Sequence, residues 1–319
     1  MNMNTSARAR TAPTRPNLTA YAFLAPVAIL VVLFFIIPAL LVIYISMTDL
    51  ATANFTSDVG QMTFIGLKNY ETLFSDPYAR KIFFNTVFYV LVTLSLFNVG
   101  GALVVALLTA HINRRAGFFF RALWLLPRLM TSTVYILMWE RMVADPPYGI
   151  LNQLFGVAGY GTAAFNTNHI WTFVILVNGI IGISFGMIIF TSAIESISKD
   201  IMNASLVDGS TAMQRIRYVI LPLMRWPLLF VLSYQTLSLL TSYEEILLFT
   251  NGGPGVYQTE VWALTAFHRA LSNYFGNAQW GYGSAFAVVL VIVGIVLAIL
   301  YLRIFRFREL VSEPKIENL

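Results

Sequence analysis

The sequence predicts an all-α, polytopic membrane protein with six transmembrane helices. Of its 319 residues, 58% are hydrophobic and only 11% are charged, whereas an ordinary soluble domain has roughly 25% charged residues. Too few charged side chains remain to cover the surface of a soluble protein of this length. The composition therefore excludes a soluble enzyme, a disordered protein and a collagen-like fibre.

Six apolar stretches are long enough to cross a bilayer as helices. A hydrocarbon core of about 30 Å requires roughly 20 helical residues. The apolar runs are continuous rather than alternating, which argues against a β-barrel. We expect spans at 20–46, 83–110, 121–142, 170–193, 226–249 and 283–305. The first stretch is too long for the apolar core of a signal peptide, so we interpret it as a retained span.

Basic residues are concentrated in alternate connecting segments. One set of segments holds Arg8, Arg10, Arg15, Arg114, Arg115, Arg121, Lys199, Arg215, Arg217, Arg225, Arg303, Arg306, Arg308 and Lys315. The positive-inside rule places this set, and with it both termini, in the cytoplasm. The predicted organisation is a cytoplasmic tail at 1–19, a membrane domain at 20–307 and a second cytoplasmic tail at 308–319.

The internal segment at 195–222 predicts two short helices joined by a tight turn. Hydroxyl side chains cap helix starts, glycine tolerates the positive φ found at many helix ends, and a helix usually ends before a proline. The residues that mark these boundaries are Ser198, Gly209, Ser210 or Thr211, and Pro222. The pair of helices is expected at the cytoplasmic face, between the fourth and fifth spans.

Several short motifs follow one another along the chain. They are Phe64-Ile65-Gly66-Leu67-Lys68-Asn69-Tyr70, Phe120-Arg121 with Leu126-Pro127, Gly149-x-Leu151-Asn152, Ala204-x-x-x-Asp208-Gly209 with Ile220-Leu221-Pro222, and Asn251-Gly252-Gly253-Pro254-Gly255. Over about residues 20–307 they resemble the permease subunits of carbohydrate ABC importers, in particular the first permease partner of a maltose-type system. The resemblance implies the ABC type I importer permease fold and half of a translocation path.

The resemblance also implies that the 195–222 segment is an EAA-type coupling loop, which docks on a separate ATPase. The residues it assigns to coupling are Asn203, Ala204, Ser205, Leu206, Asp208 and Gly209. Asn203 stands where the family usually has Glu, and Ser205 replaces an Ala; an Asn side chain can hydrogen-bond to the ATPase but cannot form an ion pair with it. The chain lacks a P-loop motif, and no cofactor is expected in it.

The partners that the resemblance implies are a second six-span permease, an ATPase homodimer that binds ATP and Mg²⁺, an extracytoplasmic solute-binding protein and a sugar. It also implies a multi-pass protein of the prokaryotic inner membrane. The basic residues are not interleaved with aromatic ones as in a nucleic-acid surface, so no nucleic acid is expected.

The resemblance places the sugar among spans four to six. The residues it assigns to the substrate path are Asn178, Ile181, Gly182, Phe185, Gln235, Ser238, Leu239 and Ser242. Amide and hydroxyl groups can hydrogen-bond to a sugar, and an aromatic ring can stack on it. The alternative is that these polar groups join helices, with Gly182-x-x-x-Gly186 as a close-packing site.

Three of the charged residues within the apolar stretches are candidates for a functional role, because charge is costly there. For Glu244 and Glu245, a polar vestibule, contact with the binding protein and simple interfacial exposure remain open. Arg128 lies about 10 Å along a helix from Arg121, and either extends toward the cytoplasm or pairs with a partner subunit.

An anionic substrate would require a cation in the path. Spans four and five have none away from their ends, which favours a neutral disaccharide or oligosaccharide such as an α-glucoside. Glycerol 3-phosphate or another polar solute is the alternative substrate. A standalone membrane enzyme or a scaffold is the less favoured class, because the ionisable residues are scattered and a scaffold would not need a coupling loop.

Overall fold

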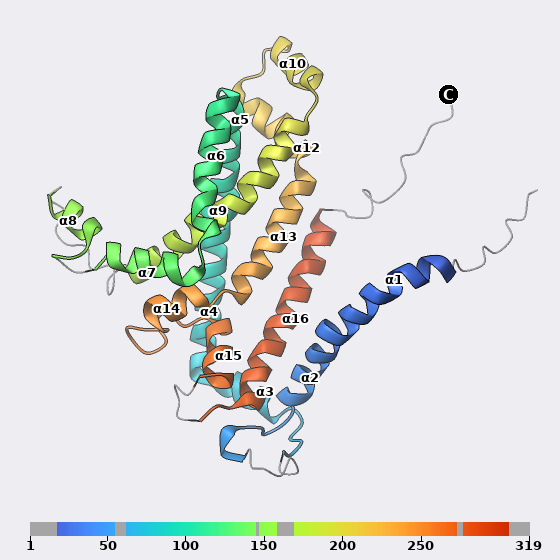
Figure 1. Cartoon of the computed structure of the whole chain (residues 1–319), viewed down its shortest axis with the longest axis vertical. Helices are drawn as coiled ribbons and strands as arrows, with labels where there is room; N and C mark the ends of the chain where they lie inside the picture. Colours follow the sequence, from blue (N-terminus) through green and yellow to red (C-terminus); the bar gives the residue numbers. More distant parts are fainter. Residues whose placement is uncertain (1–17, 55–61, 145–146, 158–168, 273–276, 306–319) are drawn as a thin grey trace, which may run out of the picture. The chain divides into compact units, whose positions relative to one another are not determined.

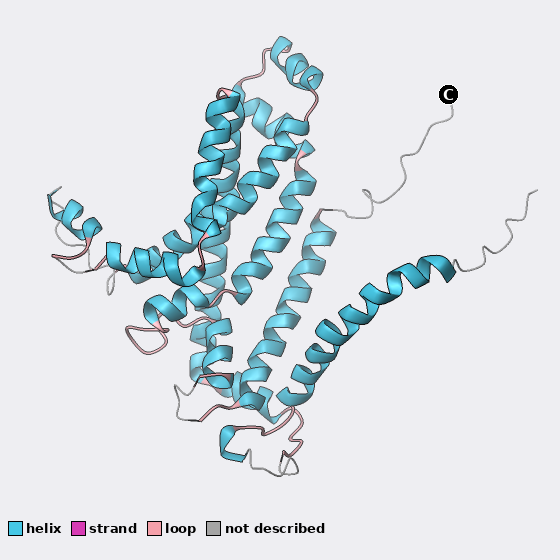
Figure 2. Ribbon diagram, viewed as in Figure 1, coloured by secondary structure: helices cyan, strands magenta, loops and turns pink. Residues whose placement is uncertain are grey.

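The computed structural model describes residues 18–54, 62–144, 147–157, 169–272 and 277–305 (Figure 1). All of the regular elements in these ranges are helices (Figure 2), and the one β-bridge there joins Thr48 to Phe64. The predicted C-terminal tail at 308–319 and residues 1–17 of the N-terminal tail lie outside the described residues. So do their basic residues, which are Arg8, Arg10, Arg15, Arg306, Arg308 and Lys315.

The chain divides between Tyr44 and Ile45 into two units. The first unit contains most of one long helix, which is made of α1 (Leu18–Val31), a π-helical turn η1 (Val32–Ile36) and α2 (Ile37–Ser46). Its residues from Tyr21 to Ser46 are long and apolar enough to cross a membrane. These bounds agree with the span expected at 20–46.

Three further helices of spanning length lie in the second unit. One is made of α4 (Pro77–Thr93), η4 (Leu94–Gly101) and α5 (Ala102–His111), and the others are α9 (Ile170–Ser196) and α16 (Trp280–Ile304). They correspond to the spans expected at 83–110, 170–193 and 283–305. The first of them begins six residues before its predicted start, because Asp76 caps it and Pro77 occupies its first position.

The span expected at 121–142 is not one continuous helix. Helices α6 (Arg114–Leu129) and α7 (Ser132–Met142) meet there at a bend of 99°. Met130 and Thr131 have extended backbone conformations between them. Pro127 lacks a backbone N–H and weakens the last turn of α6, and an apolar pattern alone does not report such a break.

The span expected at 226–249 is also interrupted rather than one continuous helix. Helix α13 (Arg225–Thr241) ends at Ser242, which is extended, and α14 (Glu244–Thr250) begins after Tyr243. The side chain of Ser242 hydrogen-bonds to a carboxylate three residues on, and such local bonds compete with helix continuation.

The sequence predicted that the second internal helix ends before Pro222, and this prediction is wrong. The helix continues from α11 (Ala212–Arg215) through a π-helical turn η5 (Ile216–Ile220) into α12 (Leu221–Leu223), and it meets α13 at a bend of 74°. Pro222 lies just after this π-helical turn, within the continuous helix. The described residues thus contain four helices of spanning length, or six spans if each bent pair is counted as one.

The second unit also contains shorter helices. They are η2 (Thr52–Asn54), α3 (Lys68–Ser75), α8 (Ile150–Val157), α10 (Lys199–Val207) and α15 (Trp262–Ala270). Helix α10 lies at one end, and α3 and α15 lie at the other (Figure 1). We call these the α10 end and the α15 end.

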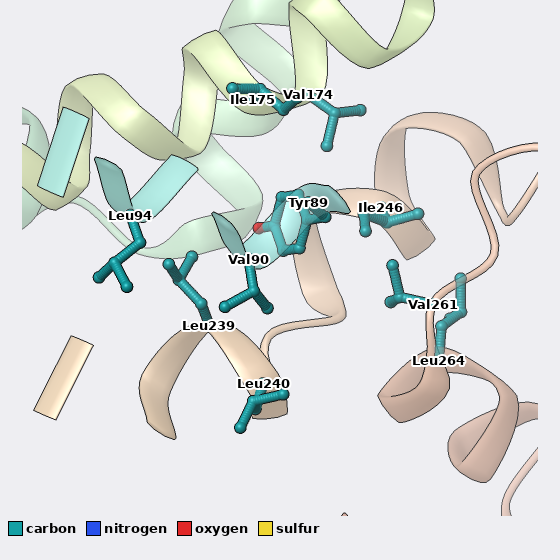
Figure 3. Close-up of a cluster of buried hydrophobic side chains, with 10 residues drawn as sticks. All are labelled: Tyr89, Val90, Leu94, Val174, Ile175, Leu239, Leu240, Ile246, Val261 and Leu264. Atoms are coloured by element: carbon teal, nitrogen blue, oxygen red, sulfur yellow. The ribbon is translucent and has the colours of Figure 1, made fainter. Parts of the chain in front are cut away.

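Helix α9 forms the centre of the second unit and packs against α4, η4, α5, α6 and α13. Toward the α15 end, its buried residues join a cluster around Tyr89 (Figure 3). The cluster consists of Tyr89, Val90, Leu94, Val174, Ile175, Leu239, Leu240, Ile246, Val261 and Leu264. Toward the α10 end, Ile183, Met187 and Phe190 join a second cluster with residues of α5. A helix that is apolar all round is expected to be buried on most of its faces.

Candidate functional site

Helix α10 begins and ends as the sequence predicted. Ser198 accepts a hydrogen bond from the backbone N–H of Asp200 at its start. At its end, the N–H of Gly209 donates to Leu206 O and the N–H of Ser210 donates to Ser205 O, at 3.0 and 3.1 Å. This pair of bonds is a Schellman motif, and Gly209 has the positive φ, +71°, that the motif requires. The helix is thus closed by a rigid turn.

One face of α10 packs on the protein and the rest is exposed. Ser205 is buried and donates from its hydroxyl to Met202 O, while Met202 is half-buried. The other residues that the resemblance assigns to coupling are exposed: Asn203, Ala204, Leu206, Asp208 and Gly209. Val207, beside them, is 87% exposed. The helix therefore presents apolar side chains that nothing in the described part of the chain covers.

Glu244 and Glu245 join α14 to α7. Glu245 accepts hydrogen bonds of 2.7 Å from the hydroxyl of Tyr135 and from the hydroxyl of its neighbour Ser242. Glu244 accepts a short hydrogen bond from Ser132. Ser132 and Glu244 are the first residues of their helices, so these contacts connect the two helices immediately after their breaks.

Two predicted path residues reach this polar network. The amide of Asn178 on α9 donates to Ser242 Oγ at 3.5 Å, and the hydroxyls of Tyr89 and Ser242 are 3.3 Å apart. The network thus brings together α4, α7, α9 and the α13–α14 break. Sequence reasoning missed Ser132, Tyr135 and Tyr89. The signal that could have found the first two is the run of hydroxyl residues that follows Pro127 on the third apolar stretch.

Three other predicted path residues are buried between helices of this chain. The amide of Gln235 donates to Gly182 O at 2.9 Å, which joins α13 to α9. A Cβ atom on Gly182 would lie 2.0 Å from Asn98 Oδ1, so η4 and α9 approach closely at this glycine. Leu239 lies in the cluster around Tyr89. Their contacts are those expected of residues that hold helices together, and a role in substrate contact stays a prediction.

The remaining predicted path residues are more accessible. Ile181 and Phe185 on α9 are half-buried, and Ser238 on α13 is exposed. The ring of Phe185 stacks on that of Tyr234, with centroids 4.5 Å apart. No group of three or more His, Asp and Glu residues that could hold a metal ion occurs within the described ranges.

The chain matches known proteins over most of its length, although no family model matches it. The probable ABC transporter permease protein YesP of Bacillus subtilis is 30% identical over 298 residues, which cover 90% of each chain. The trehalose/maltose transport system permease protein MalF of Thermococcus litoralis is 26% identical, over 91% of this chain and 94% of the relative. The sn-glycerol-3-phosphate transport system permease protein UgpA of Escherichia coli is 28% identical, over 89% of this chain and 92% of the relative.

A solved structure shares the fold. It is that of a bacterial alginate ABC transporter in complex with alginate pentasaccharide-bound periplasmic protein, with a TM-score of 0.75 over 91% of this chain and 94% of that chain, at 21% identity. The chain therefore belongs to the ABC transporter permease proteins, because it is similar to YesP over most of both chains and shares the helical fold.

Proposed function

We propose that this chain is one permease subunit of a binding-protein-dependent importer of carbohydrates, coupled through α10 to a separate ATPase. Its relatives are transport permeases, and MalF is named for trehalose and maltose. In this proposal α10 lies on the cytoplasmic side, ATP and Mg²⁺ bind to the ATPase homodimer, and the α15 end faces the solute-binding protein. A second six-span permease completes the translocation path.

The observation that carries the coupling proposal is the exposed apolar surface of a rigidly closed helix. Leu206 and Val207 are exposed at the tip of α10, next to the Gly209 turn. Burying such side chains in a groove of another protein is favourable. Because the turn is rigid, movement of the groove displaces α10 as a body, and the displacement can bias an equilibrium between two arrangements of the spans.

In the proposed path, the accessible residues contact the substrate and the buried ones position them. Asn178 and Ser242 offer polar groups, and Phe185 offers an aromatic ring. Ser238 extends the exposed face of α13. Gln235, Gly182 and Leu239 then hold α9 and α13 in register.

The test of the proposed function uses two strongly exposed valines as a matched pair. Val207→Glu places a charge on the surface that docks in the proposal. Val157→Glu places the same charge on α8, where Val157 is 90% exposed. The chain is co-expressed with candidate ATPase and permease partners, and co-purification and binding-protein-stimulated ATP hydrolysis are measured.

We expect Val207→Glu to reduce ATPase co-purification and stimulation at least tenfold, and Val157→Glu to preserve both. If the unsubstituted chain retained no ATPase, or if Val207→Glu left association and stimulation unchanged, the coupling proposal would be wrong.

A further inference from the structure

Arg128 is held against the aromatic side of the proposed path. Its guanidinium carbon lies 5.4 Å from the ring centroid of Phe185, a residue that the sequence assigned to the path. Phe185 stacks in turn on Tyr234, and Phe230 lies 6.1 Å from Phe185. A cation over a ring at this distance is attracted by the negative face of the ring. The contact brings α6, α9 and α13 together at one place.

No acid in the described part of the chain forms an ion pair with Arg128. The ion pairs in the described ranges are Arg121–Glu195 and His268–Glu260, and Arg128 takes part in neither. Its guanidinium N–H groups donate to no protein atom in those ranges, and its side chain is exposed. It follows Leu125, Leu126 and Pro127 in the last turn of α6, within the third apolar stretch of the sequence. A cation inside the membrane without an acidic partner requires an anion or water, and such residues usually mark a substrate pathway.

The two aromatic partners of Phe185 belong to an exposed strip on α13. Phe230, Tyr234 and Ser238 are spaced by four residues, so they lie on one face of the helix, and all three are exposed. Ser238 is itself a predicted path residue. The cation therefore lies at the edge of an aromatic and polar strip, rather than alone in apolar surroundings.

We propose that Arg128 is a substrate-binding residue and that the substrate of this permease is an acidic carbohydrate. The inference rests on the proposed function as an importer. A guanidinium group donates in parallel to the two oxygens of a carboxylate, or to those of a phosphate or sulfonate. The aromatic ring faces bind the apolar faces of a sugar, and Asn178 and Ser238 supply hydrogen bonds to its hydroxyls.

This reverses the sequence-based preference for a neutral sugar. That preference followed from the absence of a cation in the middle of spans four and five. Arg128 belongs to the third apolar stretch, and only the folded arrangement of α6 brings it to Phe185. The cation that an anionic substrate requires is therefore present in the path, and it comes from the third apolar stretch rather than from spans four and five.

The experiment measures ATP-dependent uptake by the complete transporter, with its second permease, ATPase and binding protein, in proteoliposomes. Three labelled probes are compared: digalacturonate, glycerol 3-phosphate and maltose. The variants are Arg128→Gln, Arg128→Lys and, as a matched control on the same helix, Arg121→Gln.

We expect uptake of at least one anionic probe, with an increase in KM of at least tenfold in Arg128→Gln and partial recovery in Arg128→Lys. Arg121→Gln should change uptake of all transported probes by the same factor, because it removes a helix-to-helix contact.

Three results would overturn the assignment. The first is uptake of maltose alone, at a rate independent of Arg128. The second is loss of the second permease from purified Arg128→Gln complexes, which would identify a carboxylate of that subunit as the partner. The third is dependence of the Arg128→Gln defect on anionic lipid, which would identify a lipid phosphate. Absence of ATP-dependent uptake of every probe would overturn the proposed function itself.

Discussion

The hydroxyl of Tyr135 donates a 2.7 Å hydrogen bond to Glu245 Oε1, and this bond joins two helices that each begin directly after a break. Tyr135 lies in the first turn of α7, and Glu245 lies in the first turn of α14. A carboxylate that accepts from both Tyr135 and Ser242 fixes α14 relative to α7 and to the end of α13.

The first prediction concerns this bond. Tyr135→Phe removes the donor and leaves the ring, and we expect it to lower the free energy of unfolding by about 1.5–3 kcal/mol, as for hydrogen bonds to charged groups. Thermal unfolding of the purified transporter measures the loss. Tyr148→Phe is the matched control, because Tyr148 is 83% exposed and should change the stability little.

A double-mutant cycle that combines Tyr135→Phe with Glu245→Gln measures the interaction energy between the two side chains. We expect a coupling of about 0.5–3 kcal/mol between the two substitutions. Strictly additive effects would show that the two side chains do not stabilise each other.

The second prediction concerns the turn after α10. Gly209 has φ +71°, and a Cβ atom there would meet nothing within 4 Å, so backbone strain alone decides which residues are tolerated. Asn tolerates this conformation, whereas a β-branched residue is strained by about 1–2 kcal/mol. We expect Gly209→Asn to preserve binding-protein-stimulated ATP hydrolysis and Gly209→Val to reduce it severalfold. Equal activity of the two variants would contradict a role for the turn geometry.

The third prediction concerns the contact between Gly182 and Asn98. Asn98 Oδ1 is buried, has no hydrogen-bond partner in the described ranges, and would lie 2.0 Å from a Cβ atom on Gly182. Overpacking of this kind typically costs about 1–3 kcal/mol. We expect Gly182→Ala to lower the melting temperature.

Adding Asn98→Ala to Gly182→Ala should restore part of the loss, because it removes the side chain that the new methyl group meets. Gly156→Ala, where a Cβ atom meets nothing within 4 Å, serves as the control. No recovery in the double variant would mean that the strain lies elsewhere than between these two residues.

The fourth prediction distinguishes two adjacent glycines in the turn after α14. Gly252 has φ +82°, and its Cβ position lies 1.9 Å from Glu260 Oε2. Glu260 is buried and pairs with His268 at 3.0 Å. Gly253 has no positive φ, and its nearest Cβ contact is Thr250 O at 3.3 Å.

We therefore expect Gly252→Ala to destabilise the protein by about 2 kcal/mol or more, since backbone strain alone accounts for about 1–2 kcal/mol and the buried pair must also shift. Gly253→Ala should cost less. Thermal unfolding measures the stability of both variants. A larger loss of stability in Gly253→Ala than in Gly252→Ala would refute the role given to Glu260.

The local features of the cytoplasmic loop follow from the sequence because their causes are local. The capping bond of Ser198 and the positive φ of Gly209 each depend on a few neighbouring residues. The ends of the long apolar helices are predictable for a similar reason, since the length and polarity of a stretch determine whether it can cross a bilayer. The breaks at Met130 and Ser242 were not predicted, because an apolar run has the same composition whether it is straight or bent.

The sequence by itself determined that this protein is a helical membrane protein, where its long helices lie, and that one internal segment forms a short helix with a rigid end. Only the tertiary structure decided which polar side chains meet. It directs Gln235 to a backbone carbonyl of α9, joins Tyr135 to Glu245, and brings Arg128 to Phe185. The physical reason is that side chains on different helices pair according to the depth and rotation of those helices, and the packing of all the helices together sets both.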